Sequence, residues 1–247
     1  MNLSINEASL FVHKLDRLVR NHPDVEVVLA PTMLALQPVH LQVQHHHFDL
    51  AAQNFYWRDH GAYTGEVSAS QLRGIVKYAL VGHSERRHVF GEPNRDIRHK
   101  VQAAFRNQII PVLCVGETAS ERADGETNDV LHDQLVGGLA NITSEEAERL
   151  VVSYEPVWAI GTGKSATPGD VEKAIRAIRS QVRYLFGDKA ARKLRVLYGG
   201  SITVDNAKSF LTAKGVDGLL VGGASLDAHG FAEIIKKSYG DKVVAKK

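Results

Sequence analysis

Short, almost wholly apolar runs alternate along the chain with longer segments whose apolar residues recur at helical spacing. A run that is apolar on both faces is typical of a parallel strand covered by helices. The pattern therefore predicts repeated strand–helix units. The predicted strands are Glu26–Ala30, Phe48–Gln53, Tyr78–Gly82, Ile109–Val115, Leu150–Tyr154, Leu194–Tyr198 and Val216–Val221. The predicted helices include residues 1–20, Val39–Gln44, Ser68–Val76, Asp96–Asn107, Thr127–Leu139, Pro168–Phe186, Val204–Lys214 and Phe231–Tyr239.

Seven such strands in 247 residues predict an α/β protein built as a (β/α) barrel, in which the chemistry lies at the carboxyl ends of the strands. The eighth strand of a full barrel would precede the first helix, because only that helix lacks a strand before it. No Pro- or Ser-rich linker divides the sequence, which favours a single domain over residues 1–247.

The composition agrees with a packed soluble protein, since 44% of the residues are hydrophobic and 23% are charged. Thirty Lys and Arg residues against 28 Asp and Glu give a net charge of +2, so nucleic acid is not an expected partner. No segment approaches the roughly 18 apolar residues of a membrane span, and no targeting peptide is recognisable. With Cys114 as the single cysteine, we expect a cytoplasmic protein without an intrachain disulfide. The triplet His45, His46 and His47 is expected in a solvated loop rather than in a metal site.

The five-residue segment His83–Arg87, which is rich in titratable side chains, follows the third predicted strand. A histidine at this position can act as acid, base or neutral hydrogen-bond donor. Alternatively, Glu85 and Arg87 form a structural ion-pair network to which His83 is merely adjacent. The five residues alone leave both interpretations open.

Glu155 follows the fifth predicted strand and is a candidate general base, whose pKa would rise beside apolar residues. The eleven residues after it are predicted to form a lid, because Gly161 and Gly163 permit left-handed backbone and Trp158 offers apolar surface. Residues Gly163 to Ser165 also match the end of a nucleotide-binding P-loop, but position 158 is Trp where that motif needs Gly. The predicted lid is Pro156, Val157, Trp158, Ala159, Ile160, Gly161, Thr162, Gly163, Lys164, Ser165 and Ala166.

Two glycine-rich turns, beginning at Gly199 and Gly222, end the last two predicted strands. Exposed backbone N–H groups at these strand ends are typical of a phosphate site in a barrel. Ordinary tight turns are the alternative interpretation.

Together these segments resemble the triosephosphate isomerase family, in order and over essentially the whole chain. The resemblance implies a TIM barrel and interconversion of dihydroxyacetone phosphate and D-glyceraldehyde 3-phosphate through an enediolate, without metal or organic cofactor. The matching segments are Ala51–Asn54, Gly61–Glu66, His83–Arg87, Cys114–Glu117, Tyr154–Lys164, Tyr198–Ser201 and Val221–Ser225.

The resemblance also implies roles for individual residues. Glu155 would move the proton between the two adjacent carbons, and neutral His83 would polarise the carbonyl. Glu85 would lie beside the substrate pocket, whereas Arg87 and Cys114 would support the structure. The residues implied to grip the phosphate are Gly161, Ser201, Gly222 and Gly223.

Family members open with a strand that ends in Asn-x-Lys-Met-Asn, and this sequence starts at Met1-Asn2. On this resemblance the first strand and its lysine precede residue 1, so impaired isomerase activity is expected for the chain as given. The alternatives are an impaired homologue that acts in phosphate binding or protein interaction, and another phosphate-sugar isomerase or synthase on the same barrel.

Residues 54–66 resemble the protruding loop of the family, whose tip at Thr64 inserts near the neighbouring subunit's active site. The resemblance implies a homodimer in which Thr64 and Glu66 belong to the contact. Phe55, Tyr56 and Trp57 would add apolar area to the loop, or alternatively pack locally within it.

Overall fold

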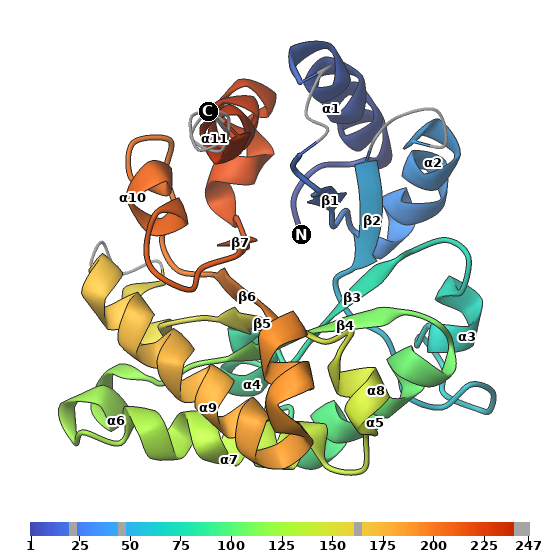
Figure 1. Ribbon diagram of the computed structural model, residues 1–247. Coiled ribbons are helices and arrows are strands. Elements are labelled where there is room, and N and C mark those ends of the chain that lie inside the picture. Colours follow the sequence, from blue (N-terminus) through green and yellow to red (C-terminus); the bar gives the residue numbers. More distant parts are fainter. Residues whose placement is uncertain (20–23, 44–47, 161–164, 240–247) are drawn as a thin grey trace.

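The computed structural model describes residues 1–19, 24–43, 48–160 and 165–239. Seven parallel strands form one sheet, in which each strand pairs with the next along the chain. This order confirms the predicted α/β architecture with seven strands (Figure 1). The strands are β1 (Val27–Leu29), β2 (Phe48–Ala52), β3 (Tyr78–Val81), β4 (Ile110–Val115), β5 (Val151–Tyr154), β6 (Arg195–Tyr198) and β7 (Gly218–Leu219).

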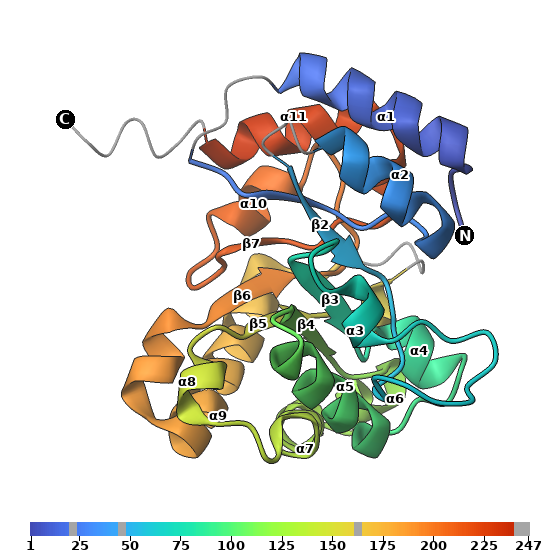
Figure 2. The ribbon, with the colours of Figure 1, turned by 90° about the vertical axis from the view of Figure 1, so that its right-hand side faces the viewer.

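Helices cover the outer side of the curled sheet (Figures 1 and 2). The first helix contacts both the second and the last helix, and the ring centroids of Phe11 and Phe231 lie 6.5 Å apart. The helix layer therefore joins the regions of β1 and β7, which are the two edges of the sheet in the described part of the chain. The helices are α1 (Ile5–Leu18), α2 (Met33–Val43), α3 (Ala69–Leu72), α4 (Ser84–His88), α5 (Asn94–Arg106), α6 (Ala119–Ala123), α7 (Thr127–Leu139), α8 (Ser144–Ala147), α9 (Pro168–Lys193), α10 (Ala207–Leu211) and α11 (Ala228–Tyr239), with 3-10 turns η1 (Val157–Ala159) and η2 (Gly223–Leu226).

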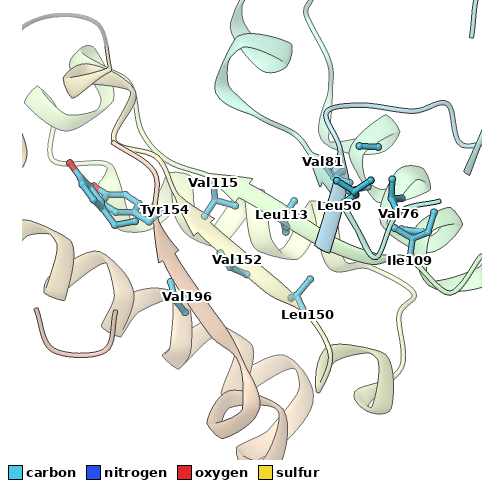
Figure 3. Packing of buried hydrophobic residues seen from close by; sticks show 14 of the residues in the cluster. Leu50, Val76, Val81, Ile109, Leu113, Val115, Leu150, Val152, Tyr154 and Val196 are labelled. Carbon is cyan, nitrogen blue, oxygen red and sulfur yellow. The ribbon is translucent and has the colours of Figure 1, made fainter. Parts of the chain in front are cut away.

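Successive residues of each strand face alternately the helices and the barrel interior. In β5, Val152 is buried in the large cluster between sheet and helices (Figure 3). Val151 belongs instead to a smaller, separate cluster. Glu155 is an even number of positions from Val151, so its side chain faces the same side of the strand. It therefore points to the barrel interior at the carboxyl end of β5. The smaller cluster consists of Ala51, Tyr78, Val112 and Val151.

Several predicted helices have the wrong bounds, and α2 and α3 differ for clear physical reasons. Helix α2 begins at Met33 rather than at Val39, because buried Ala35 and Leu36 extend it and Pro38 is accommodated inside it. Helix α3 ends at Leu72 rather than at Val76, since Gly74 adopts a positive φ of 82° that a helix does not continue through.

Side-chain caps mark the beginnings of helices α1 and α9. Ser4 caps α1 and Thr167 caps α9, each in a reciprocal capping box with the residue three positions on. Helix α9 extends to Lys193, beyond the predicted end at Phe186, with a break at Gly187 where φ is 86°. The last strand is shorter than predicted and covers Gly218–Leu219.

In the described ranges, none of the helices has both the length and the apolar character needed to cross a membrane. The His45–His47 triplet lies outside the described residues. That residues 1–247 form a single domain stays a prediction.

Candidate active site

The predicted site residues lie just beyond the carboxyl ends of four strands of the same sheet. His83 follows β3, Glu155 follows β5, Ser201 follows β6, and Gly222 and Gly223 follow β7. Because all seven strands are parallel, their carboxyl ends all lie at the same end of the barrel. The described fold thus brings to one end of the barrel the segments that the sequence singled out.

His83 is held by the turn that starts α4. Its Nδ1 atom accepts a hydrogen bond of 3.3 Å from the backbone N–H of Glu85. When one ring nitrogen of a neutral imidazole accepts, the other carries the proton. The neutral ring therefore presents its N–H at Nε2, on the side of Glu155.

The Glu155 side chain is buried and reaches towards β3 from the end of β5. Its Oε2 accepts a 2.9 Å hydrogen bond from the backbone N–H of Ser84, and its Oε1 lies 3.4 Å from His83 Nε2. Within the described chain, Oε1 has no hydrogen-bond partner. Burial raises the pKa of Glu155, although the neighbouring His83 and the Ser84 hydrogen bond act in the opposite direction. A buried carboxylate with one unpaired oxygen beside an imidazole is suited to moving protons.

Two glycines make room for Glu155. A Cβ on Gly116 would lie 1.8 Å from the carbonyl oxygen of Glu155, so β4 and β5 approach closely only because that atom is absent. A Cβ on Gly199 would lie 3.0 Å from Glu155 Cγ and 2.6 Å from Ser153 Oγ. The glycine in each motif is therefore explained by packing against the candidate base.

Arg87 and Cys114 lie behind the site. Arg87 donates to the carbonyl oxygens of Gly82 and Cys114, at 2.7 and 3.0 Å, and to Asn94 Oδ1 at 2.7 Å. Its described partners thus join the ends of β3 and β4, and they do not include Glu85. Burial, followed by the charge of Glu155, raises the pKa of the Cys114 thiol well above its usual value. Glu85 is largely exposed, with its carboxylate 3.9 Å from His83 Nδ1.

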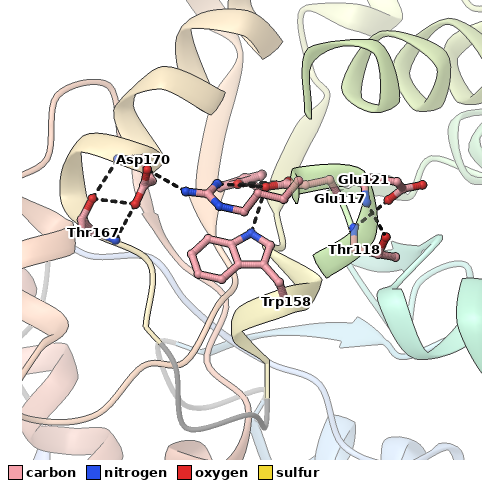
Figure 4. Close-up of polar contacts among 8 residues, drawn as sticks. Glu117, Thr118, Glu121, Trp158, Thr167 and Asp170 are labelled. Atoms are coloured by element: carbon pink, nitrogen blue, oxygen red, sulfur yellow. Dashed lines mark hydrogen bonds and ion pairs between the residues drawn. The ribbon is translucent and has the colours of Figure 1, made fainter. Parts of the chain in front are cut away.

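A polar cluster around Glu117 lies beside the candidate base and was not predicted as part of the site (Figure 4). The fully buried Glu117 carboxylate accepts hydrogen bonds from Tyr154 Oη at 3.1 Å and from Trp158 Nε1 at 2.9 Å. It also pairs with Arg122 at 3.3 Å. The sequence feature that could have indicated this cluster is Glu117 itself, a glutamate shortly after an apolar predicted strand, in the segment Cys114–Glu117.

The remaining predicted residues have less extensive contacts. Ser201 is half-buried, and Gly222 and Gly223 are exposed, with open space where a Cβ would project from either glycine. Of the predicted lid, residues 161–164 lie outside the described part of the chain, and they include the phosphate-binding candidate Gly161. Among the described lid residues, Ala159 and Ala166 are buried.

The loop at residues 54–66 extends from the body of the molecule after β2 (Figure 2). Its tip is exposed, including Thr64 and Glu66. Phe55 is buried, and the Tyr56 ring stacks on Trp57 with 4.1 Å between centroids. The centroid of the Trp57 ring also lies 5.6 Å from that of the His99 ring on α5, so the aromatic residues pack against the body of the same chain as well as within the loop. In the described ranges, no three His, Cys, Asp or Glu side chains are grouped as a metal site requires.

Comparison with known proteins gives one consistent result. The triosephosphate isomerase family model matches residues 1–238. The triosephosphate isomerase of Carboxydothermus hydrogenoformans is 45% identical over 233 residues, which cover 94% of this chain and 93% of that protein. The enzymes of Chloroherpeton thalassium and Clostridium perfringens are 43% and 41% identical over 235 and 236 residues, covering 95% of this chain and 93% and 95% of those proteins.

The comparisons do not bear out the expectation of impaired activity. They agree with the predicted barrel and with the predicted family. On this evidence the chain belongs to the triosephosphate isomerase family.

Proposed function

We propose that Glu155 and His83 carry out the reaction of this family member, the interconversion of dihydroxyacetone phosphate and D-glyceraldehyde 3-phosphate. The observation that carries the proposal is the 3.4 Å separation of Glu155 Oε1 from His83 Nε2 at the carboxyl ends of β5 and β3. Both directions of the reaction need a base at carbon and a proton donor at oxygen, and these two groups supply them.

Glu155 removes a proton from the carbon beside the carbonyl, and the electron pair left on carbon moves to form the enediolate. The Nε2–H of His83 hydrogen-bonds to the developing oxyanion and exchanges protons between the two oxygens. Glu155 then returns its proton to the former carbonyl carbon, and the new carbonyl forms at the carbon that lost its proton. Burial of Glu155 favours this cycle, because a raised pKa makes the carboxylate a stronger base.

The substrate phosphate is bound beyond β6 and β7, by Ser201 and by the backbone at Gly222 and Gly223. Backbone N–H groups at such turns attract an anion, and the absence of a side chain at both glycines lets a phosphate approach. That residues 156–166 cover the bound substrate stays a prediction.

The protein acts in the cytoplasm as a homodimer and needs no cofactor. Exposed apolar residues occur on three successive connections, after β1, β2 and β3, whose strands are neighbours in the sheet. Such a grouping is typical of a protein interface. The residues are Leu34, Tyr63, Val89 and Phe90. Sedimentation equilibrium of the parent and of Phe90→Asp tests this; a monomeric parent at micromolar concentration would contradict it.

A coupled optical assay with each triose phosphate tests the catalytic assignment. The parent is expected to convert both substrates, and His83→Gln is expected to lower kcat by roughly 10²- to 10⁴-fold, the usual contribution of a general acid or base. His132→Gln is the control, because His132 contacts Gln181 on the outer helices, away from the strand ends. Parent-like kcat in His83→Gln would refute the role of His83, and an inactive parent would refute the reaction.

A further inference from the structure

Arg122, on the short helix α6, contacts three elements that surround the candidate base (Figure 4). Its Nη1 lies 3.3 Å from Glu117 Oε1, and its Nη2 donates to Asp170 Oδ1 at 2.9 Å. The guanidinium also stacks on the Trp158 ring, 4.1 Å from the centroid. Local sequence patterns do not indicate this role, because Arg122 and Asp170 are 48 positions apart.

On one side, Arg122 compensates a carboxylate that has no access to water. Glu117 holds the residues on both sides of Glu155, since it accepts from Tyr154 Oη and Trp158 Nε1, and its backbone oxygen accepts from Val157 N–H at 3.0 Å. A buried carboxylate keeps such a geometry only when its charge is balanced. In the described part of the chain, Arg122 is the cation paired with it.

On the other side, Arg122 fixes the beginning of α9. Asp170 is the third helical residue and bonds through its second carboxylate oxygen to the Thr167 hydroxyl at 2.7 Å. Arg122 thus ties turn η1, which starts two residues after Glu155, to the first turn of α9. A planar guanidinium suits this task, because it can serve two carboxylates and an aromatic face at once.

We propose that Arg122 is a positioning residue for the isomerase reaction: through Glu117 and Asp170 it holds the chain on either side of Glu155 in the geometry that returns the proton quickly. This inference rests on the proposed function of Glu155. When the proton is returned slowly, the enediolate has time to expel its phosphate by cleavage of the C–O bond. Loss of Arg122 therefore lowers turnover and raises phosphate release per turnover.

A purely stabilising role would have a different signature. The Arg122 side chain is 34% exposed, but its partner Glu117 is fully buried, so loss of Arg122 also destabilises the fold by leaving that carboxylate without a counter-charge. If stabilisation were its whole role, substitution would lower the melting temperature and leave the partition between isomerisation and phosphate release unchanged. The partition is therefore the decisive readout.

The test compares Arg122→Met, which keeps the apolar stem on Trp158, with Arg122→Lys, which restores a charge without the planar fork. Arg149→Met is the matched control, since Arg149 is exposed, lies over the Phe105 ring at 6.0 Å, and precedes β5 at the end of the strand opposite to Glu155. For each protein, kcat and KM with dihydroxyacetone phosphate, inorganic phosphate released per isomerisation, and the melting temperature are measured.

Arg122→Met is expected to lower kcat by about tenfold and to raise phosphate release per turnover, because small misplacements of reacting groups are costly. For both kcat and phosphate release per turnover, Arg122→Lys is expected to give values between those of Arg122→Met and the parent. Arg149→Met is expected to match the parent in both quantities. An unchanged partition in both Arg122 variants would overturn the proposal, even if their melting temperatures fall. If Arg122→Met does not fold, the partition measured for Arg122→Lys decides. An inactive parent would instead refute the proposed function.

Discussion

Glu155, the proposed base, combines burial with incomplete hydrogen bonding. Its side chain is buried, it receives one backbone hydrogen bond, and its other oxygen has no partner among the described residues. Burial raises its pKa, so the charged form that accepts a proton is disfavoured in the folded protein. A group with a raised folded-state pKa favours folding below its unfolded pKa and loses that contribution as pH rises through the folded value.

Glu155→Gln is therefore expected to be more stable than the parent at neutral pH while losing activity. Glutamine keeps an acceptor for Ser84 N–H and removes the buried charge, so the gain in unfolding free energy is about 1 kcal/mol, as in other stability–activity exchanges. Urea unfolding at pH 7 and pH 4 measures it, and the difference should shrink at the lower pH. The surface variant Glu233→Gln is the control, and a Glu155→Gln protein less stable than the parent at pH 7 would contradict the account.

At the scale of elements, the sequence predicted the strands well and the short connections poorly. Strand β5 and its terminal Glu155 were predictable because an apolar run and its carboxylate are adjacent in sequence. Helix α4 was not, since its five residues are too few to show a helical period. The contacts of Glu117 with Trp158 and Arg122 depend on tertiary folding, which local patterns do not encode. Gly199 was predicted as a turn residue, but its packing and that of Gly116 against Glu155 appear only in three dimensions.

Gly116→Ala tests that packing at the junction of β4 and β5. The added Cβ would meet the Glu155 carbonyl oxygen at 1.8 Å, so the two strand ends must separate and displace the base. We expect kcat to fall at least tenfold, with destabilisation of about 1–3 kcal/mol, as for other overpacked sites. Gly169→Ala, in the first turn of α9, is the matched control because the nearest atom to its Cβ lies at 3.8 Å. Parent-like activity in Gly116→Ala would show that this close approach is not required.

At the scale of the whole molecule, charged side chains connect distant strands at the amino end of the barrel. Glu26, just before β1, accepts hydrogen bonds from Lys77 at 2.6 Å, from Tyr78 Oη at 2.6 Å, and from Arg195 at the start of β6. Burial would raise the pKa of Glu26, but these three donors outweigh it and lower the pKa to about 2. The network therefore joins β1, β3 and β6 at the end of the barrel opposite to the active site.

Glu26→Gln is expected to destabilise the protein by about 1 kcal/mol at pH 7, a modest value because the group is partly exposed and screened. A depressed folded-state pKa contributes stability above the unfolded value of 4.5 and loses it as pH falls towards about 2. The difference between variant and parent, followed by urea unfolding, should thus diminish over this range. Glu145→Gln, at an exposed position, is the control; a difference that stays constant with pH would count against the network.

Isomerisation in heavy water tests most directly whether Glu155 carries the proton between two carbons of the substrate. A proton held on the carboxylate exchanges with solvent, so the parent is expected to place deuterium on C2 of the glyceraldehyde 3-phosphate that it forms from dihydroxyacetone phosphate. Glu155→Gln is expected to form this deuterated product at least about 10³-fold more slowly, while Glu233→Gln matches the parent. Deuterated product formed by Glu155→Gln at the parent's rate would contradict the account.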